Sequence, residues 1–260
     1  MPPDAVNRFR FAFGYAGRHL LISACLAAVA GLFVFGLLYP PPFASLLGVG
    51  RMFVLLLVVD ALCGPLLTLI LANPAKSRRE RWVDFSLIGL VQLAALLYGL
   101  HSLWLARPVV LAFEADRLVI VRANEVETET LAQAPAGLQS LPYWGVMPVS
   151  TRKARNSEEF FESVQLNLAG VSPAMRPHWW QPWENAHSAM AQRARPVRDL
   201  IEQRPQEAAT LQAAVAKTGV PIDQLRFLPL ASRKTGDWVA LLDPRLQIVG
   251  YVPVDGFLRP

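Results

Sequence analysis

Residues 52–72 read MFVLLLVVDALCGPLLTLILA, a run with one charged side chain. An apolar helix of roughly 20 residues is long enough to cross the hydrocarbon core of a bilayer. Two more runs of this length lie on either side, at about residues 20–39 and 85–105. Proline follows each run within a few residues, as expected where a helix ends. The sequence therefore predicts a domain of three transmembrane α-helices within residues 1–106.

The composition is typical of a membrane protein. Of the 260 residues, 53% are hydrophobic and 17% are charged, whereas about a quarter of an ordinary soluble domain is charged. The net charge of +5 is compatible with a nucleic-acid ligand, but the basic residues cluster at the ends of the apolar runs, as membrane topology requires. Cys25 and Cys63 lie inside apolar runs, which excludes a disulfide scaffold and a Cys-x-x-Cys metal site. We therefore expect contact with a lipid bilayer and none with nucleic acid.

The basic residues also predict the orientation of the chain. They gather before the first run and between the second and third, at Arg8, Arg10, Arg18, Lys76, Arg78, Arg79 and Arg81. The loop between the first and second runs carries only Arg51. By the positive-inside rule the N-terminus is cytoplasmic, and residues 107–260 lie in the periplasm of a bacterial inner membrane. A cleaved signal peptide is the alternative for the first run, but that run is too long and no A-x-A site follows it.

Residues 107–260 are enough for one independently folded domain. A helix is expected to begin at Asn156, with Glu159 completing a capping box, and to end at Gly170. Its apolar residues share one face: Phe160, Phe161, Val164 and Leu168. Further helices are expected from about Trp183 to Lys217, with breaks at Pro196 and Pro205 and a stop at Gly219; strands are expected at Val109–Phe113, Arg117–Arg122, Gln224–Leu230, Trp238–Leu242 and Gln247–Val252. The prediction is an α+β domain whose terminal strands meet in one antiparallel sheet.

Motifs for catalysis are absent from the sequence. It has no Walker loop, dinucleotide-binding glycine motif, H-E-x-x-H motif or kinase signature. Residues 170–174 resemble a nucleophile elbow, but Pro173 supplies no N–H for an oxyanion hole. His178 and His187 near Glu184 are a conceivable metal set, although isolated surface histidines are much more common. We expect a protein that is not an enzyme and has no catalytic residue, cofactor or metal.

Small and polar residues form stripes on the predicted membrane helices. Asp60, Gly64 and Thr68 are spaced four apart, and Pro65 leaves a backbone carbonyl without its helical partner. Stripes of this kind allow helices to pack closely, and a charged residue in a bilayer should face protein or water. The candidate groove for helix packing or for a partner helix consists of Asp60, Gly64, Pro65, Thr68, Gln92, Ala95 and Gly99; the first helix adds Ser23, Ala27 and Gly31. Its function is either to hold the three helices together or also to receive a partner's helix; ion transport is disfavoured because one acid forms no relay.

Tryptophan is concentrated in residues 177–183, PHWWQPW. These rings are either a buried aromatic plug, a binding surface, or side chains that lie along the membrane interface. Tryptophan is enriched at binding hot spots. The candidate periplasmic partner surface is Trp144, Trp179, Trp180 and Trp183.

The membrane motif resembles a known family. Residues 58–69, VVDALCGPLLTL, followed by NPAK at 73–76, are similar to the TfpX/TfpZ family of type IV pilin accessory proteins, as are Asp84, QLAA at 92–95 and Tyr98-Gly99. Residues 107–109 and 113–117 continue the match, which covers residues 8–122 well and the remainder more loosely. The resemblance implies an inner-membrane chaperone for one particular pilin, which modulates fibre extension and retraction. Its implied partners are the cognate major pilin and the pilus assembly machinery, and no catalytic residues come with the family.

A membrane-anchored periplasmic sensor or ligand-binding protein is the alternative. Such a protein acts through a cytoplasmic output domain or a partner that carries one. The cytoplasmic side here has only about 18 N-terminal residues and one short loop, too little to signal alone. A pilin, in contrast, has one membrane span and a periplasmic head. This chain offers its membrane helices to the span and its periplasmic domain to the head.

Overall fold

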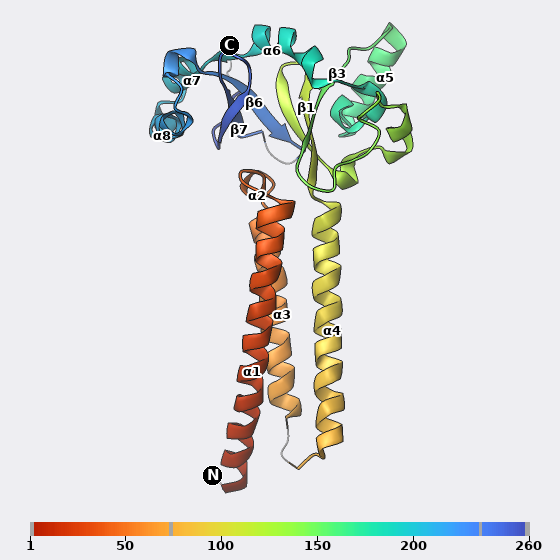
Figure 1. Ribbon diagram of the computed structural model, residues 1–260, viewed down its shortest axis with the longest axis vertical. Coiled ribbons are helices and arrows are strands. Elements are labelled where there is room, and N and C mark those ends of the chain that lie inside the picture. The colour runs from red at the N-terminus through yellow and green to blue at the C-terminus, as the bar shows by residue number, and fades with distance from the viewer. Residues whose placement is uncertain (1–2, 73–74, 234–235, 258–260) are drawn as a thin grey trace. The chain divides into compact units, whose positions relative to one another are not determined.

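The computed structural model describes residues 3–72, 75–233 and 236–257 (Figure 1). The chain divides into two compact units, one that ends at Leu105 and one that begins at Ala106.

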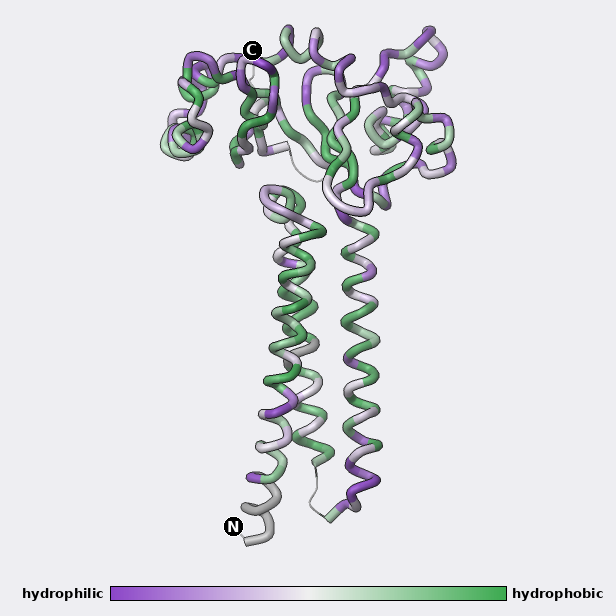
Figure 2. Tube along the Cα trace, viewed as in Figure 1, coloured by the Kyte–Doolittle hydropathy of each residue, from purple (hydrophilic) through white to green (hydrophobic). Residues whose placement is uncertain are grey.

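The N-terminal unit is built from long apolar helices. They are α1 (Pro3–Phe33), which continues as the π-helix η1 (Val34–Leu38), the short α2 (Phe43–Leu46), α3 (Val49–Leu71) and α4 (Arg78–Leu105). Three helical stretches in the described chain are long and apolar enough to cross a membrane: Arg10–Leu38, Val49–Leu71 and Arg78–Leu105. Figure 2 shows hydrophobic residues along most of α1, α3 and α4. The three predicted spans coincide with these stretches, apart from the last residue of the first and second spans, Tyr39 and Ala72, which are C-caps.

The helix α4 begins earlier than the apolar run that it contains. Ser77 and Glu80 form a capping box: the Ser77 N–H donates to Glu80 Oε2 at 2.8 Å, and the Glu80 N–H donates to Ser77 Oγ at 3.2 Å. Lys76 Nζ lies 2.5 Å from Asp84 Oδ2 across the first turns. These polar contacts extend α4 by about two turns before residue 85, where the apolar run begins.

The C-terminal unit contains one mixed sheet. Its strands are β1 (Pro108–Glu114), β2 (Arg117–Arg122), β3 (Met147–Thr151), β4 (Trp180–Gln181), β5 (Arg195–Pro196), β6 (Arg226–Ser232), β7 (Trp238–Leu242) and β8 (Ile248–Val252). The order is β4-β3-β1-β2-β6-β7-β8, and β5 pairs with β6. The β1–β2 hairpin and the β6–β7–β8 meander are antiparallel, as predicted.

The prediction of a purely antiparallel sheet is wrong. The two ends of the domain do meet, but β2 pairs with β6 in parallel, with Leu118 opposite Leu230. A second parallel pair joins β1 to β3, a strand that the sequence analysis did not predict. β3 contains Pro148 and has an irregular burial pattern, so it lacks the alternation that marks a half-buried strand. Polar stretches separate these pairs in sequence, and the parallel arrangement requires such crossover connections.

The helices of the C-terminal unit follow the predicted breaks. They are α5 (Ser157–Leu168), α6 (His187–Arg193), α7 (Val197–Gln203) and α8 (Ala208–Thr218), with short 3₁₀ helices η2 (Ala123–Glu125), η3 (Thr128–Gln133), η4 (Pro173–Met175), η5 (Pro177–Trp179), η6 (Trp183–Ala186), η7 (Pro205–Glu207) and η8 (Ile222–Gln224). Asn156 caps α5 by accepting the Glu159 N–H at 2.8 Å, as predicted, but the Glu159 carboxylate accepts the N–H of Arg155 in place of that of Asn156, so the predicted capping box forms only in part. Gly219 ends α8 with a φ of +68°, a conformation that glycine adopts without strain.

Two apolar cores stabilise the domain. The first surrounds β1, β2 and β3 and includes Val110, Val149, Met175 and Trp180. The second lies between the meander and the helices α7 and α8, with Leu200, Leu211, Phe227 and Leu241. In Figure 1 α5 lies beside the β1–β3 half of the sheet, and α7 and α8 lie beside the β6–β7 half. α5 is therefore attached to the half of the sheet that the first core supports.

Candidate functional site

Polar side chains join all three long helices of the N-terminal unit. His19 Nδ1 on α1 lies 2.6 Å from Thr68 Oγ1 on α3, and His19 Nε2 bonds Gln92 Oε1 on α4. Thr68 is 2% exposed. Thr68 and Gln92 were predicted site residues, whereas His19 was not. The signal for His19 was its spacing, because it lies four residues before Ser23 and extends the stripe of α1 by one turn.

Two glycines allow α3 and α4 to approach closely. A Cβ built on Gly64 would lie 2.1 Å from Gln92 Nε2, and one on Gly99 would lie 2.6 Å from Leu56 Cδ1. Both distances are far below van der Waals contact, so these positions accept only glycine without rearrangement. The Gly64–Thr68 stripe therefore faces helices of the same chain.

The other predicted groove residues are placed differently. Pro65 is half-buried, and Ala95 is exposed on α4. The backbone of Asp60 belongs to α3, but its side chain lies outside the described residues. A hollow of about 450 Å³ instead follows the small residues of α1, where it is lined by Ser23, Ala24, Ala27, Ala28, Gly31, Phe53 and Leu57.

The tryptophan cluster divides between core and surface. Trp179 and Trp180 are 3% and 2% exposed, and Trp180 Nε1 donates to the carbonyl oxygen of Ala174 at 2.8 Å. Two successive 3₁₀ helices, η4 and η5, turn this segment inward. Trp183 is half-buried, and Trp144 is 53% exposed. The prediction that Trp179 and Trp180 lie on a surface is thus corrected: both rings are buried in the domain.

Trp179 anchors two arginines that hold α5. The guanidinium carbons of Arg152 and Arg176 lie 4.4 and 4.5 Å from the centroid of its ring. Arg152 binds both carboxylate oxygens of Glu159, with the shorter contact at 2.6 Å. Arg176 is 3% exposed and donates to Ser163 Oγ at 2.6 Å. Burial lowers the pKa of Arg176, although the nearby Glu127 and Glu114 oppose this shift.

As a result α5 binds the domain through polar contacts, and its apolar face is exposed. Ser163 is the buried residue of this helix. Phe160, Phe161, Val164 and Leu168 share one face, as predicted, and are 55%, 65%, 40% and 85% exposed. A surface helix ordinarily turns such a face to the core. Exposed apolar patches of this kind commonly mark interaction sites.

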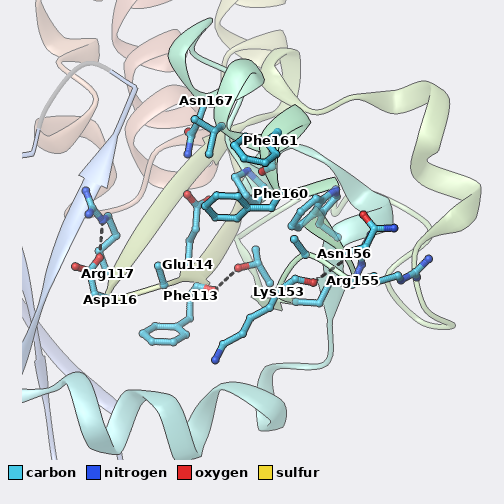
Figure 3. Close-up of a pocket in the computed structure, with 18 of the residues that line it drawn as sticks. Phe113, Glu114, Asp116, Arg117, Lys153, Arg155, Asn156, Phe160, Phe161 and Asn167 are labelled. Atoms are coloured by element: carbon cyan, nitrogen blue, oxygen red, sulfur yellow. Dashed lines mark hydrogen bonds and ion pairs between the residues drawn. The ribbon is translucent and has the colours of Figure 1, made fainter. Parts of the chain in front are cut away.

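A groove of about 910 Å³ lies between α5 and the turn that joins β1 to β2 (Figure 3). The side of the groove formed by α5 is lined by Phe160, Phe161 and Val164. The side formed by the turn is lined by Glu114, Asp116 and Arg117. Lys153, Arg155 and Arg193 contribute positive charge. The groove therefore combines an aromatic wall with basic groups.

The Glu159 contacts make the attachment of α5 dependent on pH. The hydrogen bonds from Arg152, and then the N–H of Arg155, lower the pKa of Glu159 from 4.5 to about 2. Because the folded pKa lies below the unfolded value, this stabilisation is complete above pH 4.5 and is lost as the pH falls toward 2. We expect α5 to lose amide-exchange protection across this window in the detergent-solubilised chain, after correction for intrinsic exchange rates.

The matched variant is Glu159→Gln, which should lack this transition and have low protection of α5 already at pH 7. Helix α8 is the internal control, since no carboxylate of this kind holds it. Parallel loss of protection in α5 and α8 would mean that the whole domain unfolds in acid, and would contradict a local role for Glu159.

The histidines near Glu184 do not form a metal centre with it. Within the described parts of the chain, no group of three His, Cys, Asp or Glu side chains is placed to hold a metal ion. His178 Nδ1 lies 3.8 Å from Glu127 Oε2, but burial lowers the pKa of His178 below 6.5. Burial therefore disfavours the charged imidazole that an ion pair with Glu127 requires.

Comparison with known proteins identifies the family. A family model described as fimbrial assembly protein FimB matches residues 7–48. The fimbrial assembly proteins of Dichelobacter nodosus serogroups I and E1 are 32% and 34% identical, each over 96% of this chain and 98% of its own length. The fimbrial assembly protein of serogroups C1 and C2 is 41% identical over 49% of this chain, a match that covers 98% of that protein's own length. No solved structure matches. The chain therefore belongs to the family of fimbrial assembly proteins, which confirms the resemblance to the pilin accessory family noted in its membrane motif.

Proposed function

We propose that this protein is a non-enzymatic, pilin-specific accessory protein of type IV pilus assembly in the bacterial inner membrane. The observation that carries the proposal is that the similarity to fimbrial assembly proteins extends over 96% of the chain. Both units are therefore expected to serve fimbrial biogenesis. In this role the protein is a chaperone that retains a pilin subunit at the membrane. Such retention shifts the balance between fibre extension and retraction.

The N-terminal unit is the element that contacts the pilin's transmembrane helix. Lipid tails are as apolar as leucine, so helices associate in a bilayer by close packing and a few hydrogen bonds. The hollow lined by Ser23, Ala27 and Gly31 offers small side chains for this purpose. The Gly64–Thr68 stripe already packs against α1 and α4, and its role is to hold the bundle together.

The C-terminal unit is the element that contacts the pilin head. The positive-inside rule supports a periplasmic location for this unit, on the side of the membrane where the head of a membrane-bound pilin also lies. Trp144 and the aromatic side chains of α5 are exposed there. Two modest contacts, one in the membrane and one outside it, reinforce each other by effective concentration.

Deletion and exchange of the two units test the proposal. Deletion of the gene should abolish or strongly reduce piliation, and the full chain should restore it. Exchange of residues 107–260 with those of a family member that serves a different pilin should transfer pilin preference, because burial in water supplies more discrimination than packing in lipid. Piliation is measured with both chimeras and both pilins.

The reciprocal chimera, in which residues 1–105 are exchanged, is the control and should keep the original preference. Preference that travels with residues 1–105 would assign specificity to the membrane helices. Normal piliation in the deletion strain would refute a role in pilus assembly.

A further inference from the structure

We propose that the groove between α5 and the β1–β2 turn binds an extended segment of the partner protein that carries apolar side chains flanked by carboxylates. The identification of that partner as the pilin head rests on the proposed function. The chemistry of the segment rests on the groove itself.

The apolar requirement follows from the way α5 is attached. The contacts of Arg152 with Glu159 and of Arg176 with Ser163 fix the polar side of the helix to the domain. This orientation leaves Phe160 and Phe161 more than half exposed in the groove. Burial of apolar surface is worth roughly 25 cal/mol per Å². A partner whose apolar side chains cover both rings therefore binds more tightly than one that leaves the rings in contact with water.

The acidic requirement follows from the charges around the groove. The carboxylates in its lining already have partners: Glu114 Oε2 accepts the Ala174 N–H at 2.9 Å, and Asp116 lies 2.8 Å from Arg117 Nε. In contrast, Lys153 and Arg193 form no ion pair with any described residue, and Arg152 and Arg155 act on Glu159, which is outside the lining. Basic side chains in the lining therefore outnumber acidic ones, and complementarity selects an anionic segment.

The shape of the site favours a protein segment over a lipid surface. Aromatic and basic residues also occur on helices that lie in an anionic membrane interface. Such helices present an open face, whereas the rings of α5 line a groove whose other wall is the β1–β2 turn. A volume of about 910 Å³ is large enough to hold several side chains.

Site-specific photocrosslinking in living cells tests the inference. We replace Phe161 by p-benzoylphenylalanine in the full chain and probe the adducts with an antibody to the major pilin. Gln165 is the matched position, since it is exposed on the same helix but belongs neither to the lining of the groove nor to the apolar face. A pilin adduct is expected from position 161, with little or none from position 165.

Charge reversal tests the chemistry of the segment. Lys153→Glu combined with Arg155→Glu should reduce the adduct from position 161 roughly fivefold to tenfold, as expected for the loss of two interfacial charge pairs. Arg245→Glu is the control, because Arg245 is exposed in the turn between β7 and β8 and far from the lining residues in sequence. That variant should leave the adduct unchanged at equal protein levels.

Four outcomes overturn the inference. Equal adducts from positions 161 and 165, or no effect of the charge reversal, exclude the groove as the binding site. An adduct with phospholipid, identified by mass spectrometry, assigns this surface to the membrane. An adduct with a protein other than the pilin excludes the pilin as occupant. The proposed function fails separately, if deletion of the gene leaves piliation unchanged.

Discussion

Trp180→Ala is expected to unfold or nearly unfold the C-terminal unit. The ring is 2% exposed in the first core, and its Nε1 donates to the Ala174 carbonyl oxygen at 2.8 Å. Removal of a buried Trp costs about 3–5 kcal/mol, and a domain is stable by only about 5–15 kcal/mol. We expect lower soluble yield, rapid proteolysis after Ala106, and a much lower midpoint in urea for the detergent-solubilised chain.

Two further variants separate packing from other effects of the substitution. Trp180→Phe keeps most of the packing but leaves the Ala174 carbonyl oxygen without its donor, at a cost of about 1–3 kcal/mol. Trp144→Ala removes a ring that is 53% exposed and should cost less than about 1 kcal/mol. If Trp144→Ala destabilised the domain as much as Trp180→Ala, the division of the cluster into core and surface would be incorrect.

Elements with local signals could be predicted from the sequence. The apolar runs, the prolines after them and the capping residue Asn156 act within one or two turns of the chain. The β1–β2 hairpin has two short runs of apolar, mostly β-branched residues around a short turn, and Gly219 ends α8. Each of these features depends on neighbours in the sequence.

The parallel pairs could not be predicted in this way. β2 and β6 are separated by about a hundred residues, and no local pattern specifies whether two distant strands run in the same direction. The direction of the apolar face of α5 is a similar case. The spacing of Phe160, Phe161 and Val164 defines a face, but the contacts of Arg152 and Arg176 with Trp179 determine which side of the helix meets the domain.

The candidate site in the N-terminal unit was predicted in part. The stripes identified Gly64, Thr68 and Gln92, because small and polar residues are conspicuous in apolar helices. His19 was missed because it lies near the beginning of the first apolar run. Its contacts with Thr68 and Gln92 join residues 49 and 73 positions apart, and only the packed bundle brings them together.

Gly64→Leu is expected to separate α3 from α4. Even a Cβ at this position would lie 2.1 Å from Gln92 Nε2. The atoms met are the end of the flexible Gln92 side chain, so we expect Gln92 to shift and weaken its hydrogen bond with His19, which couples the substitution to all three helices. Overpacking costs about 1–3 kcal/mol, and an interhelical hydrogen bond in a membrane protein adds about 0.6 kcal/mol on average. Titration of the purified chain with SDS should show unfolding of the helical bundle at a clearly lower detergent fraction.

Gly89→Leu is the matched control, because it adds the same side chain to α4 at an exposed position where a Cβ meets nothing within 4 Å. It should leave the unfolding midpoint unchanged or raise it slightly, since leucine favours a helix more than glycine does. His19→Leu should lower the midpoint less than Gly64→Leu, because it removes the hydrogen bonds without the steric conflict. The combination of both changes should be less than additive, since each breaks the same contact with Gln92. Additive effects would mean that Gly64 acts on the helices independently of the His19 contacts, and that the close approach of α3 to α4 alone holds them together.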